Sequence, residues 1–424
     1  MAINKQLLKE IIVDQQQLLL PDYSIPREKQ SLVASCFPND YVVILSGLRR
    51  CGKSTLLQYV RKEQPYQDYY FNFDDERVAT FKLNDFQLLY ELFIEMFGDQ
   101  PFFYFDEIQN IVGWERFIRR LHDYNKKIII TGSNAKMLSQ ELGTHLTGRY
   151  RQIELFPFSF VEFCQFKHYK YDKTDGTVAK ATMQRYFNEY ILQGGIPTYL
   201  RLQDTQYLSD LYESIIYRDI VSRYNLSNPT ELKALVYHAA SNLGKSITYS
   251  KLRQMLLIKN STTIKNYLYY LQQSYLLFVI SKFDFSTKRQ ELAPKKIYFV
   301  DTKLAQIVGF RYSPDSGRIL ENIVYLQLRC NYREIFYFQE TKECDFIIQT
   351  INGDWLAMQV TLDMRDKETE QRELAGLGEA MTALKLSEGW VITLDQEEER
   401  EFIYHGKSLV IHIVPAWKWF HTFS

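Results

Sequence analysis

Residues 47–54, with the sequence Gly-Leu-Arg-Arg-Cys-Gly-Lys-Ser, match the pattern G-x-x-x-x-G-K-[ST] at every fixed position. This pattern constrains the fold strongly, because it requires a strand before the loop and a helix after it. An apolar run at 41–45 precedes the motif, and a predicted helix at 53–61 follows it. Glycines let a backbone wrap around phosphates, and N–H groups at a helix N-terminus point at the anion. The context therefore predicts a phosphate-binding loop and disfavours a fortuitous glycine turn.

The positions within this loop predict individual roles and two ligands, ATP and Mg²⁺. Lys53 is expected to reach the β- and γ-phosphates, and the Ser54 hydroxyl is expected to ligate Mg²⁺. The predicted nucleotide-binding residues run from the first glycine to the residue after the serine: Gly47, Leu48, Arg49, Arg50, Cys51, Gly52, Lys53, Ser54 and Thr55.

Short apolar runs alternate with helical patterns from about residue 38 to 155. Strands are predicted at 41–46, 69–73, 101–105, 127–131 and 151–155, and helices at 53–62, 84–97, 114–124 and 135–142. Such alternation is typical of a parallel sheet with helices on both faces. The sequence therefore predicts an α/β fold of the P-loop NTPase class for this region.

Two acids follow the third predicted strand. Residues 102–105 are all aromatic, and Asp106 and Glu107 come directly after them. Asp106 is expected to hold the Mg²⁺ shell, and Glu107 is expected to orient and deprotonate the attacking water. Solvated acids at an ordinary strand end are the alternative. Because these acids accompany a complete phosphate-binding loop, the pattern favours ATP hydrolysis over phosphate binding alone.

Polar residues also follow the next predicted strand. The apolar run at 128–130 leads through a threonine and a glycine into Ser133 and Asn134. A polar group there lies beside the acid-bearing strand in many P-loop sheets, so either residue is a candidate for contacting the γ-phosphate or the water. The alternative is that one of them caps the helix predicted to start near residue 135.

An arginine near the last predicted strand is a candidate for stabilising charge in the transition state of a neighbouring subunit. We prefer Arg149 to Arg151, because Arg149 lies in the loop and Arg151 enters the strand. A solvated or ion-paired arginine is the alternative. Asn72, at the end of the second predicted strand, is a weaker candidate for restraining Glu107, and a turn residue is the alternative.

Together these motifs resemble the AAA+ superfamily, and more narrowly the prokaryotic AAA family ATPases that carry a C-terminal domain of unknown function. The resemblance implies a strand order of 5-1-4-3-2, a helical lid, a sensor 1 role for Ser133 or Asn134, and an arginine-finger role for Arg149. It implies no particular biological process. The residues that carry it are 47–54, 102–107, 130–134, 148–149 and 155–163.

Residues 229–290 resemble a winged helix, with a recognition helix at 261–273 and a wing strand at 275–283. A local excess of basic residues is consistent with contacts to DNA phosphates. A protein-docking winged helix with a solvated basic face is the alternative, and the tyrosine-rich recognition helix gives little support for base reading. The basic residues of this patch between 245 and 290 are Lys245, Lys251, Arg253, Lys259, Lys265, Lys282, Lys288 and Arg289.

Residues 294–395 resemble a PD-(D/E)XK nuclease-like fold, in which carboxylates hold Mg²⁺ and a lysine activates the nucleophile. Glu321 and Asp345 match the first two acidic positions of that fold. Gln359 and Thr361 stand where glutamate and lysine are required, so cleavage is doubtful. We rank a degenerate fold first, a divergent nuclease that uses Glu343 and Asp345 second, and a coincidental α/β fold third. The structural alternative is that Glu321 and Asp345 pair with basic neighbours.

Composition excludes several classes of protein. The 51 basic and 51 acidic residues balance, so no global charge attracts nucleic acid or an anionic membrane. Five scattered cysteines without a C-x-x-C pair argue for a reducing cytosol and against a disulfide framework or zinc site. Since the sequence has no signal-peptide pattern and no apolar run of transmembrane length, we expect a cytoplasmic protein without membrane association.

A chain of 424 residues is expected to contain several domains. We predict that ATP hydrolysis moves a C-terminal module that acts on DNA, or alternatively switches a protein partner, with self-association into oligomers. A kinase or nucleotidyltransferase is disfavoured, because no dedicated acceptor site is evident. The predicted segments are an N-terminal helix and connector at 1–35, an ATPase core at 36–160, a helical lid at 161–228, a winged helix at 229–290, and a nuclease-like domain at 291–424.

Overall fold

The chain forms two compact units, Met1–Phe156 and Pro157–Ser424. The computed structural model describes residues 3–64, 68–133, 143, 146, 148–170, 176–310 and 315–422. The helix predicted at 135–142 lies outside these residues. Within the described ranges, no helix is both long and apolar enough to cross a bilayer.

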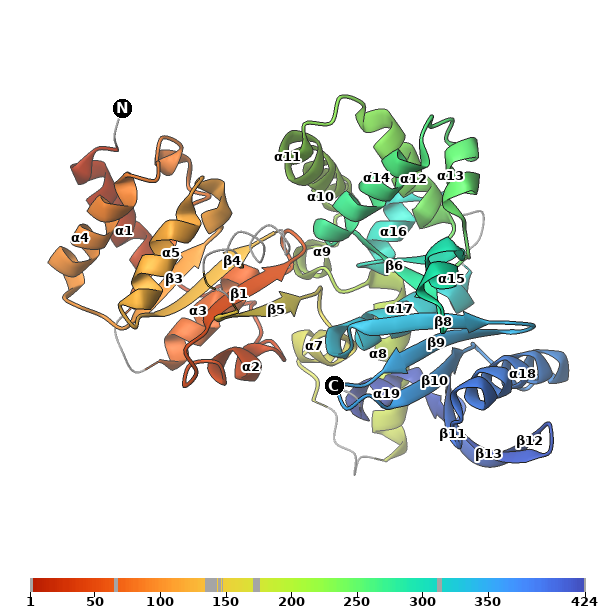
Figure 1. Cartoon of the computed structure of the whole chain (residues 1–424). Helices are drawn as coiled ribbons and strands as arrows, with labels where there is room; N and C mark the ends of the chain where they lie inside the picture. The colour runs from red at the N-terminus through yellow and green to blue at the C-terminus, as the bar shows by residue number, and fades with distance from the viewer. Residues whose placement is uncertain are drawn as a thin grey trace. The chain divides into compact units, whose positions relative to one another are not determined.

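The first unit is built on a five-stranded parallel sheet with the order β2-β3-β4-β1-β5 (Figure 1). Read from the opposite edge this order is 5-1-4-3-2, so the predicted parallel α/β fold and strand order are confirmed. Each predicted strand end lies within one residue of the observed end. The strands are β1 (Val42–Gly47), β2 (Asp68–Asn72), β3 (Phe102–Asp106), β4 (Lys127–Gly132) and β5 (Tyr150–Leu155).

Helices cover both faces of this sheet because alternate strand residues point to opposite sides. On one face, Phe71 and Phe103 belong to an aromatic core completed by α1, α4 and α5. On the other face, Arg61 of α3 lies over the ring of Tyr70 at 4.5 Å. The helices of this unit are α1 (Lys5–Gln16), α2 (Gln30–Ala34), α3 (Lys53–Glu63), α4 (Asp85–Phe97) and α5 (Trp114–Asp123), with short 3₁₀ helices at Glu76–Val78 and Ile108–Asn110.

Two glutamines of α1 cover the outer edge of β2. The side-chain amide of Gln15 accepts from the backbone N of Asn72 at 2.8 Å and donates to its carbonyl at 3.2 Å. Gln16 similarly accepts from the backbone N of Tyr70 at 3.2 Å and donates to the carbonyl of Asp68 at 2.8 Å. These amides satisfy backbone groups that would otherwise be open to another strand.

The second unit contains an eight-stranded mixed sheet with the order β12-β13-β11-β10-β9-β8-β6-β7. Strand β6 pairs with β7 on one side and with β8 on the other. The predicted boundary between residues 290 and 291 therefore falls inside one continuous sheet. The strands are β6 (Leu277–Lys282), β7 (Lys295–Phe299), β8 (Glu334–Gln339), β9 (Glu343–Gln349), β10 (Trp355–Val360), β11 (Glu388–Thr393), β12 (Glu398–Tyr404) and β13 (Lys407–Pro415).

Helices surround this sheet, and three of them precede β6 in the order predicted for 229–290. Buried side chains of α18, including Leu377 and Met381, pack on Ile347 and Val391 of the sheet. The helices of the unit are α7 (Phe160–Phe166), α8 (Thr177–Gln193), α9 (Pro197–Leu202), α10 (Thr205–Ser214), a π-helix (Ile215–Val221), α11 (Ser222–Tyr224), α12 (Pro229–Ser241), α13 (Tyr249–Met255), α14 (Ser261–Gln273), α15 (Thr287–Leu292), α16 (Thr302–Val308), α17 (Ser316–Asn331), α18 (Lys367–Leu384) and α19 (Ala416–Thr422).

A two-glycine turn between α8 and α9 is required by close packing. The buried carboxylate of Asp301 accepts from the backbone N of Gly195 at 2.7 Å, and the carbonyl of Gly195 accepts from the backbone N of Phe158 at 2.8 Å. A Cβ atom on Gly195 would lie 2.3 Å from the carbonyl oxygen of Phe158, and one on Gly194 would lie 2.4 Å from Asp301 Oδ2. The turn thus links the start of α7 to the start of α16.

We predict that Gly195→Ala destabilises the second unit by more than about 2 kcal/mol, because the added methyl group would displace backbone. The control is Gly176→Ala, where a Cβ atom meets nothing within 4 Å, and we expect a change within about 0.5 kcal/mol. Tryptophan fluorescence during denaturation is a suitable measurement, since four of the five tryptophans lie in this unit. Equal stability of the two variants would contradict the packing role.

Candidate functional site

The phosphate-binding loop connects β1 to α3, as predicted. Gly52 has φ 102°, in the left-handed region that favours glycine. A Cβ atom on Gly47 would lie 2.0 Å from the carbonyl oxygen of Leu155 in the neighbouring strand β5. Both fixed glycines of the motif are therefore required by the backbone, one by its conformation and one by close approach.

Lys53 lies at the centre of the loop and is only 4% exposed. Its ammonium donates to the carbonyls of Gly47 at 3.3 Å and Leu48 at 3.1 Å. It also lies 3.7 Å from Glu107 Oε1. Lys53 therefore connects the end of β1 with the acid that follows β3, although the two segments are more than 50 residues apart in the sequence.

Asp106 is buried at the end of β3 and is held by hydroxyl groups. Thr131 donates to Asp106 Oδ1, Tyr70 donates to Oδ2 at 3.3 Å, and Ser54 is also hydrogen-bonded to the carboxylate. Burial raises the pKa of Asp106, and the adjacent charge of Glu107 raises it further. The Ser54 hydroxyl and Asp106 carboxylate are oxygen donors of the kind that Mg²⁺ uses together with substrate phosphates, so this pair fits the predicted ion.

Glu107 adopts a left-handed backbone conformation with φ 52°. Its backbone N donates to the Thr131 hydroxyl at 3.1 Å, and its carboxylate accepts from the amide of Gln109. The side chain of Asn72 instead accepts from the backbone N of Asp74 at 2.9 Å. Gln109 therefore holds Glu107 in the way that the sequence had suggested for Asn72.

The remaining predicted residues of this site differ in their placement. Ser133 is 1% exposed, and within the described residues its hydroxyl has no hydrogen-bond partner. Asn134 lies outside the described residues. Arg149 is exposed to solvent just before β5, and its carbonyl accepts from the backbone N of Val42 at 3.0 Å.

Sequence reasoning missed Arg27, which belongs to the connector after α1. This arginine is 5% exposed and donates to the carbonyl of Cys51 in the phosphate loop at 2.7 Å. It also donates to the carbonyl of Phe156 at 2.8 Å. Because no local pattern marks an isolated arginine in a polar connector, only the folded structure identifies this bridge.

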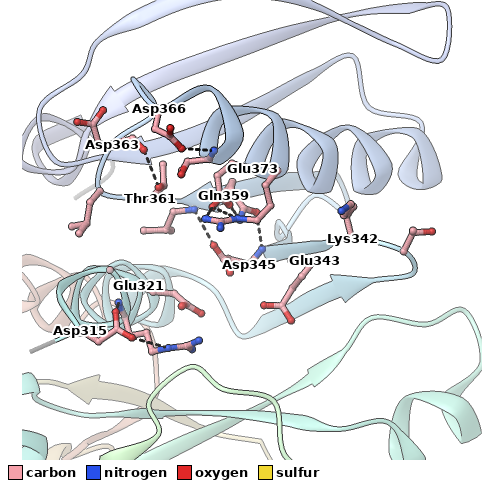
Figure 2. Close-up of a pocket in the computed structure, with 17 residues that line it drawn as sticks. Asp315, Glu321, Lys342, Glu343, Asp345, Gln359, Thr361, Asp363, Asp366 and Glu373 are labelled. Atoms are coloured by element: carbon pink, nitrogen blue, oxygen red, sulfur yellow. Dashed lines mark hydrogen bonds and ion pairs between the residues drawn. The ribbon is translucent and has the colours of Figure 1, made fainter. Parts of the chain in front are cut away.

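A pocket of about 700 Å³ in the second unit is lined by residues of α17, β9, β10 and α18 (Figure 2). Glu321, Asp345 and Gln359, the three residues of the possible degenerate nuclease site, all line it. Asp345 Oδ2 accepts from the backbone N of Val360 at 3.0 Å, and Gln359 Oε1 accepts from the backbone N of Asp345 at 3.1 Å. Gln359 also donates to Glu373 of α18, which the sequence had not indicated.

Lys296 of β7 provides a buried ammonium to these carboxylates and is 1% exposed. Its Nζ lies 2.9 Å from Glu321 Oε1, 2.8 Å from Glu343 Oε1 and 3.1 Å from Asp345 Oδ1. Burial alone would lower the pKa of Lys296, but the carboxylates, Glu321 first, raise it well above its usual range. Burial also raises the pKa of Glu321 to about 7, against the opposing effect of Lys296.

The pocket does not fit the metal that a PD-(D/E)XK nuclease requires. Each of the three N–H groups of Lys296 can meet one carboxylate, and the third-strand positions are Gln359 and Thr361. Among the residues that the structure describes, no set of three or more His, Cys, Asp and Glu side chains could hold a metal ion. The pocket therefore supports no metal-dependent step.

Comparisons with known proteins identify relatives along the whole chain. The uncharacterized protein MJ1544 of Methanocaldococcus jannaschii is 32% identical over 439 residues, which cover 100% of this chain and 97% of that protein. The chain belongs to the family of this protein. An uncharacterized protein of Haemophilus influenzae is 30% identical over 352 residues, which cover 79% of this chain and 86% of that protein.

Family models match two regions of the chain. The model of the AAA domain matches residues 39–164, and the model of a domain of unknown function (DUF8612) matches residues 184–311. The predicted AAA+ resemblance of the N-terminal region is therefore confirmed. The winged-helix and nuclease-like assignments stay predictions, because the second model has no described function.

Comparison with solved structures gives only low TM-scores. McrB AAA+ hexamers of Thermococcus gammatolerans with bound McrC give a TM-score of 0.20 at 10% identity, covering 44% of this chain and 47% of that chain. Drosophila ORC bound to AT-rich DNA and Cdc6 gives 0.22 at 10% identity, covering 70% and 92%. The fold class of the first unit accordingly rests on its strand order and on the AAA domain model.

We predict that Lys296→Met lowers the free energy of unfolding of the second unit by about 3–5 kcal/mol, because it leaves buried carboxylates without their cation. The matched control is Lys342→Met at the same pocket, where the lysine is exposed. We expect that control to change stability by less than about 0.5 kcal/mol. Urea denaturation followed by tryptophan fluorescence measures both, and a stable Lys296→Met variant would exclude the ammonium as a structural requirement.

Proposed function

We propose that the first unit binds ATP with Mg²⁺ and hydrolyses it. The observation that carries this proposal is the convergence of Lys53 and Glu107, whose charged groups lie 3.7 Å apart across the phosphate loop. Ser54 and Asp106 lie beside them and are hydrogen-bonded to each other. A cation for the phosphates, oxygen ligands for Mg²⁺ and a carboxylate base are thus held within one site.

Each residue has a separate role in this mechanism. Lys53 would exchange its bonds to the loop carbonyls for the β- and γ-phosphates, and Glu107 would accept a proton from the attacking water. The buried hydroxyl of Ser133 would donate to the γ-phosphate. Ser54 and Asp106 would hold Mg²⁺, which would neutralise part of the charge that develops on the phosphates.

We further propose that a conformational change of the phosphate loop is transmitted to the residues at the end of the first unit. Cys51 Sγ donates to the carbonyl of Leu155 at 3.3 Å, and Arg27 bridges the carbonyls of Cys51 and Phe156. Phe156 is the last residue of the first unit. Movement of the loop on nucleotide binding would therefore shift the residues that lead into the second unit, and hydrolysis would move the C-terminal module.

Self-association would complete the site. Arg149 is exposed, so its guanidinium can reach a neighbouring protomer and stabilise transition-state charge there. We propose oligomers on this basis. Separately, the five scattered cysteines without a C-x-x-C pair support a cytoplasmic location. No membrane partner is proposed.

Two targets compete for the C-terminal module. The basic residues at 245–289 support contacts with DNA phosphates, because all of them are exposed except Lys282, which is half-buried. In α14, however, Tyr267 is buried and Tyr270 stacks on Tyr224 with ring centroids 3.8 Å apart. Tyr270 is half-buried, so neither ring is fully available for base reading, and we propose DNA binding without sequence preference. A protein partner is the second candidate.

We predict that Glu107→Gln retains ATP binding and loses at least about 100-fold in turnover, because the amide cannot take a proton. Steady-state phosphate release and binding of a fluorescent ATP analogue measure the two quantities. The control is Glu91→Gln on α4, an exposed acid that should leave both unchanged. Normal turnover by Glu107→Gln would remove its assigned role.

We predict that the full chain binds duplex DNA with an affinity that falls steeply as salt rises, because phosphate contacts release counterions. Replacing Lys251 and Lys265 together by alanine should reduce the slope of log affinity against log salt by about one for each phosphate that is no longer neutralised. Fluorescence anisotropy with two unrelated duplexes measures affinity and sequence preference. Absence of binding at low salt would favour the protein-partner alternative.

A further inference from the structure

Gln109 combines two features that its place in a short 3₁₀ helix does not explain. The side chain is 7% exposed, and its Nε2 donates to Glu107 Oε2. Its Oε1 is fully buried and, within the described residues, has no hydrogen-bond partner. The reverse orientation of the amide would place its oxygen against the carboxylate, so the donor must face Glu107 and the acceptor must stay open.

A buried acceptor without a hydrogen-bond partner normally lowers the stability of the folded protein by about 1–3 kcal/mol. The amide of the adjacent Asn110 does not supply this donor, since it donates to the carbonyl of Phe73 at 3.2 Å. The open oxygen belongs to the same amide group that touches Glu107, so one small donor can reach both residues. Water has the required chemistry, with two O–H donors and a lone pair that stays free.

We propose that Gln109 is a catalytic residue that holds the attacking water together with Glu107. This inference rests on the proposed ATP hydrolysis. One O–H of the water would donate to the Glu107 carboxylate and the other to Gln109 Oε1, which leaves the lone pairs of the oxygen free to attack the γ-phosphorus. Binding the water at two points converts a mobile nucleophile into an oriented one.

The step is balanced without any further reactant. The water oxygen forms a bond to the γ-phosphorus, while the bond between that phosphorus and the β–γ bridging oxygen breaks. One proton of the water passes to Glu107, and ADP and phosphate leave. Gln109 takes no proton, because an amide is not basic; it accepts a hydrogen bond from the water and donates one to the carboxylate that acts as base.

Thr131 and Ser133 have different roles at the same edge of the sheet. The Thr131 hydroxyl donates to Asp106 and accepts from the backbone N of Glu107 at 3.1 Å, so both of its hydrogen-bonding directions are used. The Ser133 hydroxyl carries a donor and therefore suits a phosphate oxygen. Of these polar residues, Gln109 provides an open acceptor beside the base.

The test compares Gln109→Leu, which has similar size but no polar atoms, with Gln109→Asn, which keeps the amide on a shorter side chain. We expect kcat to fall about 10- to 100-fold in Gln109→Leu and less in Gln109→Asn, with KM and ATP affinity within about twofold of wild type. Gln87→Leu on the exposed surface of α4 is the matched control and should hydrolyse ATP normally. Thermal unfolding of each variant establishes that it is folded.

A double variant separates a shared water from an independent structural effect. If both residues act on one water, Glu107→Gln with Gln109→Leu should be no slower than Glu107→Gln alone. Wild-type turnover in Gln109→Leu, or a loss of ATP affinity as large as the loss of kcat, would overturn the role of Gln109 alone. Absence of turnover in the wild-type protein would instead remove the proposed ATPase function itself.

Discussion

The nucleotide site depends on the parallel order of β3, β4 and β1 in the first sheet. Parallel strands present their carboxyl ends at one edge, so residues that follow three separate strands meet there. Asp106, Thr131 and the phosphate loop come together in this way. The Thr131 hydroxyl then links the strand ends, because it donates to Asp106 and accepts from the backbone of Glu107. This contact satisfies a buried carboxylate that would otherwise be costly.

The first unit was largely predictable because its signals are local. The phosphate loop, the strand before it and the two acids after β3 each depend on a few consecutive residues, and the strand order followed from the resemblance to AAA+ proteins. Gln109 and Arg27 could not be found in the same way. The contact of Gln109 with Glu107 depends on the backbone bend at Glu107. Arg27 is identified only by its contacts with Cys51 and with Phe156, which is 129 residues away in the sequence.

The second unit shows a similar limit. The resemblance to a PD-(D/E)XK fold grouped Glu321, Asp345 and Gln359, and all three line one pocket. Lys296 was missed although it lies in the same predicted domain, because the resemblance gives no role to a lysine at that position. Only the folded sheet, which holds β7 together with the strands that carry Asp345 and Gln359, identifies it. The ammonium of Lys296 then neutralises part of the buried negative charge, and the carboxylates keep it protonated.

Coupling between the two units would begin at the phosphate loop. Arg27 and Cys51 tie the loop to Leu155 and Phe156, the last residues before the second unit. A ligand that rearranges the loop must change these contacts or strain them. The same feature explains why Gly47 tolerates no side chain, since its backbone lies against the carbonyl of Leu155.

The central claim is that the loop from Gly47 to Ser54 binds the phosphates of ATP. Calorimetric titration of the full chain with ATP, in the presence and absence of Mg²⁺, tests it most directly when wild type is compared with Lys53→Ala. The account predicts Mg²⁺-dependent binding of one ATP per chain, abolished in the variant because its buried cation is missing. Equal affinity in both proteins would place ATP elsewhere and contradict the account.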